Sequence, residues 1–236
     1  MSTLTGKKIL VIGRGSGIAR AVVTAAQSEG AHVVVAGRDP HTLREVYGAE
    51  LAVEPVDVTD EASIAALAER LVTVDHVVTT ASARARGAVS ELAPETVALS
   101  FATKAIGPIL LAKHLAPRMP EDGSFVLFSG ATAVRPTAGM LAVAGTNGAV
   151  DSITKGLAVE LAPIRVNAIA PGTVDTGAYD GLGPETKAAL FAARSATSPA
   201  RRVGTADDIA QAVLFVLTAT FLTGVSIAVD GGETLV

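Results

Sequence analysis

Short runs of consecutive apolar residues alternate along this chain with longer segments in which apolar residues recur every three or four positions. The first run, residues 8–12, stops at Gly13, as expected of a strand buried on both faces of a parallel sheet. The next segment, residues 16–28, places Ile18, Val22 and Ala25 on one side of a helix. The full pattern predicts strands at 8–12, 33–36, 51–56, 74–78, 124–128, 164–169 and 225–229.

Helices are expected between these strands, at 16–28, 40–47, 60–71, 94–117, 138–161, 184–194 and 206–217. The fourth should break near Gly107 and Pro108, because proline disrupts a helix interior. Strands that alternate with helices indicate a parallel sheet with helices on both faces. No repeat, linker or low-complexity tract intervenes. Residues 1–236 are therefore predicted to form a single α/β domain, doubly wound and Rossmann-like, with a seven-stranded sheet.

Composition narrows the functional classes. Apolar residues make up 49% and charged residues 18% of the 236 residues, so the chain can bury a large core. A net charge of −4 without a run of Lys or Arg argues against nucleic acid and membranes as partners. The expected partner is a small-molecule substrate. The chain has no cysteine and its four histidines lie far apart, so no metal site is predicted. The uncharged stretch 212–229 is expected to be a buried helix, a turn and a strand in a cytoplasmic protein.

A glycine-rich segment, Gly13-Arg14-Gly15-Ser16-Gly17-Ile18-Ala19, follows the first predicted strand. Glycines allow a tight turn and let backbone N–H groups approach a pyrophosphate at a helix N-terminus. The spacing is Gly-x-x-x-Gly-x-Gly with alanine in the last place. An ordinary glycine-rich turn is the alternative, but a position between the first strand and the first helix favours a dinucleotide-binding loop.

The end of the second predicted strand bears on the choice of cofactor. An acidic residue there would hold the free 2′-hydroxyl of NAD, whereas Arg suits the 2′-phosphate of NADP. Arg38 stands at this place, with Asp39 one position later, so NADP is predicted. A solvated surface arginine is the alternative. Asp57, after the third strand, is placed to accept from the adenine amino group, or else to cap the helix that begins near Asp60.

Three later motifs, together with this loop, make the chain resemble the short-chain dehydrogenase/reductase family. They are Arg-Val-Asn-Ala-Ile-Ala-Pro-Gly at 165–172, Thr-Val-Asp-Thr at 173–176 and Val-Asp-Gly-Gly at 229–232. The motifs stand in the family's order over residues 7–232. The resemblance implies a dimer or tetramer that binds NAD or NADP and interconverts alcohols and carbonyls. It also implies cofactor contacts at Gly13, Arg14, Ser16, Gly17, Ile18, Arg38, Asp57, Val58, Thr80, Ala81, Ser82, Lys104, Pro171, Gly172, Val174 and Thr176.

The catalytic half of the family pattern is not matched. In the family, a Tyr donates a proton, a Lys four places later lowers the pKa of that Tyr, a Ser positions the substrate and an Asn holds a water relay. The aligned places hold Val143 for Tyr, Asn147 for Lys, Gly130 for Ser and Lys104 for Asn. Ser129 lies next to the Ser place. The resemblance thus implies an atypical member, with weak reduction of simple ketones.

The Asn and Lys places have exchanged residue types, which suggests more than a loss of function. Both places approach the same ribose and water region in this family, so Lys104 could restore a positive charge there with Asn147 as its hydrogen-bond partner. The alternative is that Lys104 reaches solvent at the predicted helix break near Gly107.

Other polar residues are weaker candidates. Tyr179 follows Thr176 in the loop that covers the substrate in this family, and is a candidate proton donor or pocket-lining residue. Arg84 and Arg86 are candidates for an anionic substrate, or for a solvated loop. The leading hypothesis is an NADP(H)-dependent oxidoreductase whose catalytic residues are drawn from Lys104, Asn147, Ser129 and Tyr179. The alternatives are a catalytically silent NADP-binding protein, serving as a partner subunit or redox sensor, and a lyase or isomerase on the same scaffold.

Overall fold

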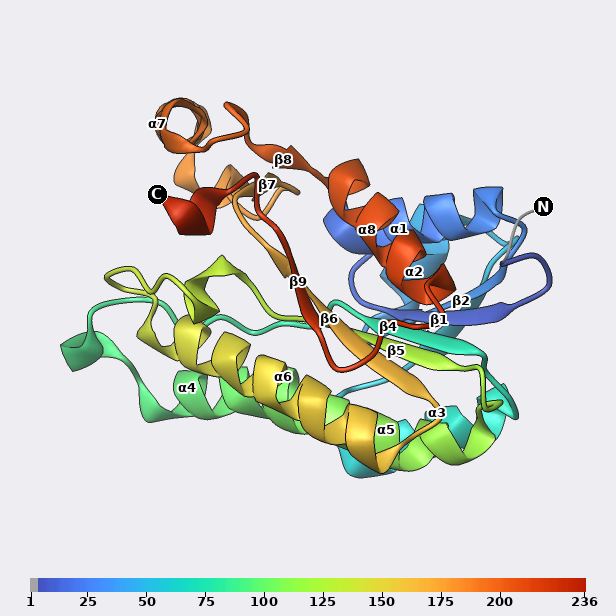
Figure 1. Cartoon of the computed structure of the whole chain (residues 1–236). Helices are drawn as coiled ribbons and strands as arrows, with labels where there is room; N and C mark the ends of the chain where they lie inside the picture. Colours follow the sequence, from blue (N-terminus) through green and yellow to red (C-terminus); the bar gives the residue numbers. More distant parts are fainter. Residues whose placement is uncertain (1–3) are drawn as a thin grey trace.

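The computed structural model describes residues 4–236 and builds them around one twisted sheet (Figure 1). All neighbouring strands in this sheet are parallel, in the order β3-β2-β1-β4-β5-β6-β9, so the predicted seven-stranded Rossmann-like sheet is confirmed. The strands are β1 (Lys8–Ile12), β2 (His32–Gly37), β3 (Ala52–Pro55), β4 (His76–Thr79), β5 (Ser124–Phe128), β6 (Arg165–Pro171) and β9 (Ser226–Val229). A second, two-stranded sheet that the sequence did not predict pairs β7 (Val174–Asp175) with β8 (Gly204–Thr205).

Helices cover both faces of the large sheet (Figure 1). They are α1 (Gly17–Ser28), α2 (Pro40–Tyr47), α3 (Glu61–Leu71), α4 (Pro94–Phe101), α5 (Gly107–Leu115), α6 (Leu141–Glu160), α7 (Pro184–Thr197) and α8 (Ala206–Thr218). Short helical turns occupy Val89–Glu91, Ala102–Ile106, Ala116–Arg118, Ala131–Ala133, Asp180–Leu182 and Glu233–Leu235.

Two apolar cores form, one on each face of the sheet. On one face α1 and α8 pack on alternate strand residues such as Ile9 and Val11. On the other face α3, α5 and α6 pack on the intervening residues, such as Leu10 and Ile12. Both faces of the strands are therefore buried, which explains why the strands read as continuous apolar runs.

Several predicted helix boundaries were wrong; the helix predicted at 184–194, for example, extends to Thr197. The helix predicted from 138 begins at Leu141, because Gly139 adopts a left-handed conformation (φ +74°) that stops a helix from starting there. The predicted break near Gly107 and Pro108 is absent. Instead, a π-helical turn at Ala102–Ile106, closed by the Gly107 N–H donating to the Ala102 carbonyl, joins α4 to α5 directly before Pro108.

The continuous helical stretch 94–118 is apolar enough, by length and composition alone, to cross a membrane. Leu111 and Leu115 of this stretch lie in the core against the sheet, as expected of an interior helix of a folded domain. The uncharged stretch 212–229 is divided between α8 and β9, as the sequence predicted.

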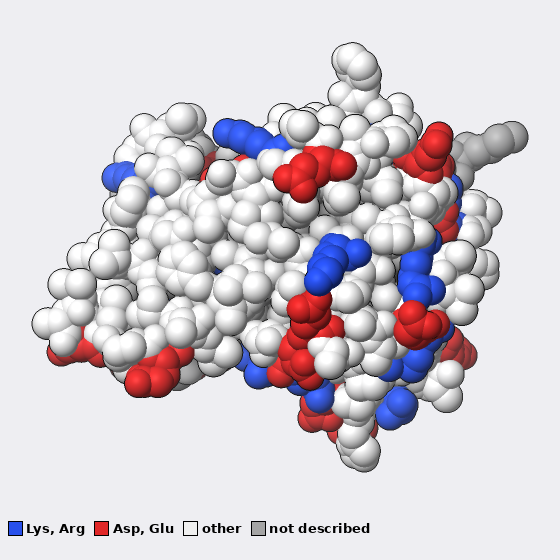
Figure 2. All heavy atoms as spheres, turned by 90° about the horizontal axis from the view of Figure 1, so that it is seen from below, with Lys and Arg blue, Asp and Glu red and all other residues white. Residues whose placement is uncertain are grey.

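Figure 2 shows the face formed by α3 to α6. Charged side chains are sparse where α4 and the start of α6 lie, and they gather toward α3. Exposed apolar side chains on these elements are Leu99, Ile106, Ile109, Leu141 and Val159.

Candidate functional site

The carboxyl ends of the central strands bring most of the predicted site residues to one edge of the sheet. β1 leads into Gly13, β4 into Thr80, β5 into Ser129 and β6 into Gly172. The chain leaves β1 toward β2 and later returns to β4 on the other side of β1. In open α/β sheets such a reversal of strand order creates a crevice where ligands bind.

Two positions in the glycine-rich loop after β1 must be glycine because other parts of the chain lie too close to them for a side chain. A Cβ on Gly13 would lie 2.2 Å from Oγ1 of Thr80, and one on Gly17 would lie 2.8 Å from the carbonyl oxygen of Thr176. Gly17 also has a positive φ of 54°. The loop therefore packs directly against two predicted cofactor-contact segments.

The N-terminus of α1 fits a phosphate group. Ser16 is the N-cap residue, but its side chain makes no capping hydrogen bond, and the first turn of α1 contains no acidic residue. The first N–H groups of a helix carry partial positive charge and are available to an anion when no side chain caps them. Together with the glycine cradle, this helix start fits the pyrophosphate of a dinucleotide.

Arg38, the residue predicted to select NADP, directly follows β2. Arg38 is exposed, and no ion pair is formed by it within residues 4–236. The Asp39 carboxylate caps α2, since it accepts from the backbone N–H and the hydroxyl of Thr42. Asp39 is thus engaged in its own helix, which leaves Arg38 as the residue available to a ribose substituent.

Asp57 does not cap α3, contrary to the alternative considered from the sequence, because Asp60 accepts the capping bond from Ala62. The Asp57 carboxylate instead accepts from the N–H and hydroxyl of Thr59. These bonds, with a smaller contribution from Arg38, hold the pKa of Asp57 below its usual range.

The remaining predicted cofactor contacts differ in how they are placed. Val58 is buried and its carbonyl approaches Gly107, while Ile18 and Ala81 pack partly against the cores. The hydroxyl oxygen of Ser82 is buried and has no hydrogen-bond partner among the described residues. Pro171, Gly172, Val174 and Thr176 follow one another from the end of β6 through β7.

Lys104 and Asn147 form the centre of the second half of the site. The Nζ of Lys104 donates to Oδ1 of Asn147 and, at 3.2 Å, to the carbonyl oxygen of Ser129. Lys104 is 9% exposed and Asn147 is 3% exposed. The predicted contact is present, and the alternative in which Lys104 reaches solvent was wrong.

Backbone and side-chain bonds fix this pair. Asn147 donates from Nδ2 to Oγ1 of Thr132 at 2.7 Å, and the Ser129 hydroxyl donates to the Asn147 carbonyl at 3.0 Å. A Cβ on Gly130 would lie 2.7 Å from the Asn147 amide nitrogen. Asn147 can therefore occupy this position only because residue 130 is glycine.

Burial changes the charge expected on Lys104. Loss of hydration, aided by the nearby positive charge of Arg84 and opposed by the carboxylate of Asp151, lowers the pKa of Lys104 to about 7. The amine is therefore divided between ammonium and neutral forms near neutral pH. Lys104 can therefore still supply the predicted positive charge, but only in the ammonium form, because the π-helical turn places it inside the protein rather than at a solvated helix break.

The other catalytic candidates have structural partners. The Ser129 hydroxyl is committed to the Asn147 carbonyl, and the Tyr179 ring packs edge-on against Phe191, with ring centres 5.5 Å apart. Val143, one turn before Asn147, is buried and apolar. Of the four candidates, only Lys104 and Asn147 form a direct side-chain pair.

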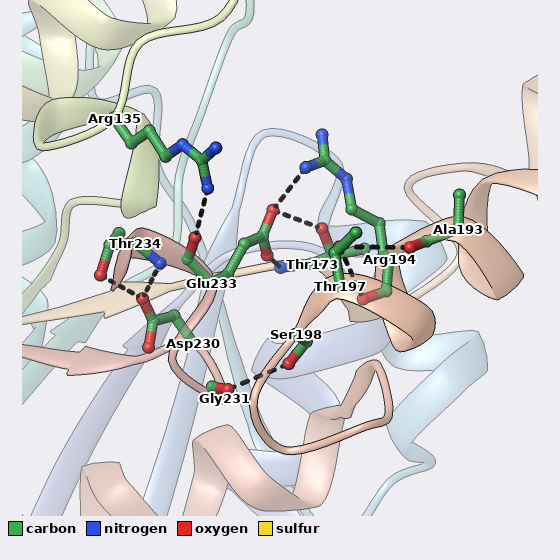
Figure 3. A network of polar contacts seen from close by, with 10 residues as sticks. All are labelled: Arg135, Thr173, Ala193, Arg194, Thr197, Ser198, Asp230, Gly231, Glu233 and Thr234. Atoms are coloured by element: carbon green, nitrogen blue, oxygen red, sulfur yellow. Dashed lines mark hydrogen bonds and ion pairs between the residues drawn. The ribbon is translucent and has the colours of Figure 1, made fainter. Parts of the chain in front are cut away.

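A network of polar contacts at the C-terminal end of the chain ties the segment after β6 to α7 (Figure 3). The Glu233 carboxylate accepts from the N–H and hydroxyl of Thr173 and pairs with Arg194 of α7 at 3.2 Å. Arg135 donates to the Glu233 carbonyl. Sequence reasoning missed Glu233, because its partners lie about 40 to 100 positions earlier and no local pattern marks them.

Known proteins resemble this chain over nearly its whole length. A family model described as Enoyl-(Acyl carrier protein) reductase matches residues 12–234. The short-chain dehydrogenase/reductase ATR9 of Stachybotrys chlorohalonatus is 32% identical over the whole of both chains. The inactive 2-(S)-hydroxypropyl-CoM dehydrogenase 2 of Xanthobacter autotrophicus is 36% identical over 93% of this chain and all of its own. A solved small-chain dehydrogenase in complex with NADPH has a TM-score of 0.84 and 33% identity, over 98% of this chain and all of that one.

Proposed function

Because the chain belongs to the short-chain dehydrogenase/reductase family, we propose that it is an NADP(H)-dependent oxidoreductase in which Lys104 exchanges the proton with the substrate oxygen. The substrate is an unidentified carbonyl compound or the corresponding alcohol. The observation that carries this proposal is the buried hydrogen bond between Lys104 and Asn147 at the carboxyl edge of the sheet.

The described residues fit NADP better than NAD. The glycine cradle and the N-terminus of α1 would hold the pyrophosphate, and Arg38 would bind the 2′-phosphate. Asp39, the nearest acidic alternative, is occupied as a helix cap. The structural relative in complex with NADPH supports the same choice.

When bound, NADPH supplies a hydride to the carbonyl carbon. Lys104 in its ammonium form has three N–H groups, of which Asn147 and the Ser129 carbonyl each accept one. The third can donate its proton to the substrate oxygen, which leaves a neutral amine that regains a proton from solvent. A group with a pKa near the working pH is suited to such general acid–base catalysis.

In this interpretation, the residues at four family places have changed together. Lys104 supplies the proton in place of the usual Tyr, and Val143 leaves the usual donor position apolar. Gly130 makes room for Asn147, which holds Lys104 by its amide oxygen. If residue 130 kept a side chain, Asn147 would have no room to accept the hydrogen bond from Lys104.

Kinetics and cofactor binding together test the proposal. Lys104→Met should abolish NADPH oxidation by whichever carbonyl in a substrate panel the wild type reduces, and the wild-type rate should fall as the pH rises above about 7 because the ammonium is lost. Lys155→Met is the matched control, since Lys155 is an exposed lysine further along α6. Full activity of Lys104→Met would contradict the proposal.

A catalytically silent NADP-binding protein is the second candidate, favoured by the 36% identical relative that is named inactive. It requires NADPH binding without NADPH oxidation across the same panel. A fluorescence titration should show NADPH binding for either candidate, and NADPH oxidation across the panel distinguishes the two, because only the enzyme consumes the cofactor.

The protein is also proposed to form a symmetric dimer or tetramer. The weakly charged face over α4 and α6 (Figure 2) and its exposed Leu99, Ile106 and Ile109 support this arrangement. We expect the protein to act in the cytoplasm on a small molecule.

A further inference from the structure

An arginine pair, Arg84 and Arg86, lies in the segment that follows β4. Ala85 is 4% exposed and points into the protein, whereas Arg84 and Arg86 on either side of it are exposed. The side chains of Arg84 and Arg86 are therefore both available at the surface, while Ala85 between them is packed inside.

Three contacts hold this segment in place. The hydroxyl of Ser100, which is fully buried, donates to the Ala83 carbonyl at 2.7 Å. The N–H of Gly87 donates to the Gly139 carbonyl at 3.0 Å, and Ala85 is packed between these two anchors. The arginines therefore stand on a fixed piece of backbone rather than on a freely moving loop.

The surroundings of Arg84 are positively charged. Partial loss of hydration lowers the pKa of Arg84, and the nearby positive charges of Arg86 and Arg14 lower it further. Arg84 in turn acts on Lys104, and Tyr179 from the loop after β7 is also within electrostatic range. Arg84 therefore lies among groups from four separate segments that converge on the proposed reaction site.

No carboxylate among the described residues pairs with these arginines, although Asp151 acts on Lys104 in the opposite sense to Arg84. Within residues 4–236, no ion pair is formed by Arg84, Arg86 or Arg14, although the chain as a whole carries a net charge of −4. The carboxylate of Glu91 comes near Gly87, but no ion pair joins it to these arginines in the part of the chain described. Fixed like charges without a counter-charge raise the energy of the free protein, and a bound anion relieves this cost.

From this arrangement we infer that Arg84, assisted by Arg86, binds an anionic group of the substrate. The substrate class is then a carbonyl compound, or its alcohol, that carries a carboxylate, sulfonate or phosphate. This inference rests on the proposed function, because it takes Lys104 as the mark of the reacting oxygen. The cofactor phosphates are the competing occupant, but the N-terminus of α1 and Arg38 already provide for them on the β1 and β2 side.

Calorimetric titration of the protein saturated with NADP+ tests the inference. The probes are benzoylformate, benzenesulfonate and phenyl phosphate, with neutral acetophenone for comparison. At least one anion should bind about tenfold tighter than acetophenone, and Arg84→Gln should remove this preference. Arg44→Gln, which removes an exposed arginine of α2, should keep it.

Three results would overturn the inference: no anion preference in the wild type, an unchanged preference in Arg84→Gln, or an Arg84→Gln variant that loses NADPH affinity while keeping the preference. The last result would assign Arg84 to the cofactor. A wild type that fails to bind NADPH would instead contradict the proposed function, and the same titration on the cofactor-free protein would still decide the role of Arg84.

Discussion

Replacing Lys104 with methionine should alter the pH dependence of folding stability in a defined direction. Burial lowers the pKa of Lys104 from 10.5 to about 7 in the folded protein, whereas in the unfolded chain it keeps its ordinary value. Between these two values the unfolded chain binds more protons than the folded protein. The free energy of unfolding of the wild type must therefore rise with pH across this interval, as far as Lys104 contributes.

The size of this effect follows from the two pKa values. One pKa unit corresponds to about 1.4 kcal/mol, so at pH 7 the buried amine destabilises the fold by about 4 kcal/mol. At pH 9 the cost falls to about 2 kcal/mol, because this pH lies closer to the pKa of 10.5 in the unfolded chain and less free energy is needed to remove the proton. Relative to Lys104→Met, the wild type should thus gain about 2 kcal/mol between pH 7 and pH 9.

Urea unfolding followed by circular dichroism at pH 7, 8 and 9 measures this difference. Lys104→Met also leaves the side-chain oxygen of Asn147 without its hydrogen bond. This loss of stability is the same at every pH, so it does not affect the pH dependence that is compared. Lys155→Met serves as the control, and its stability profile should run parallel to that of the wild type. Parallel profiles for wild type and Lys104→Met would show that the amine is not shifted, and would remove the basis for its role as a proton donor at neutral pH.

The remaining predictions concern cofactor choice, acid stability and assembly. Arg38→Ala should weaken NADPH binding roughly 10- to 150-fold, the loss of charge-assisted bonds worth about 1.5–3 kcal/mol, and should leave NADH binding unchanged in a fluorescence titration. Equal wild-type affinity for the two cofactors would contradict this. Burial lowers the pKa of His76 to about 4. As the pH falls from 6.5 to 4, the unfolded chain takes up a proton that the folded protein does not, so the free energy of unfolding should fall by up to about 3 kcal/mol. His76→Gln should remove this loss of stability in urea unfolding. Light scattering should show a multiple of 23.7 kDa, and a monomer at micromolar concentration would refute the proposed oligomer.

Most of the sheet could be predicted from the sequence because its strands are buried on both faces. The predicted run 8–12 matches β1 and the run 124–128 matches β5, each with an apolar core on either side. The two-stranded sheet of β7 and β8 escaped prediction, since each strand has two residues and no apolar pattern. The helix from 94 also misled the prediction, because Pro108 signals a break and the π-helical turn before it removes the need for one.

Spacing located the site, but not its protonation state. The family pattern brought Lys104 and Asn147 to one region, and the structure joins them by a hydrogen bond. The depressed pKa of Lys104 depends on its burial and on Arg84, which is a neighbour only in three dimensions. The same holds for Glu233, whose contacts with Thr173 and Arg194 arise from the return of the chain end to the sheet.

The two proposals are linked through the effect of Arg84 on Lys104. The positive charge of Arg84 helps to keep the pKa of Lys104 low in the free protein. An anion bound at Arg84 would offset that charge, so the pKa of Lys104 should rise and the amine should take up a proton as the substrate arrives. A neutral ketone would bring no such charge, and would find an amine that is only partly protonated at neutral pH. An anionic substrate would therefore gain both from its ion pair with Arg84 and from a larger fraction of protonated Lys104. Simple ketones would gain from neither, which is a physical reason to expect that they are reduced slowly.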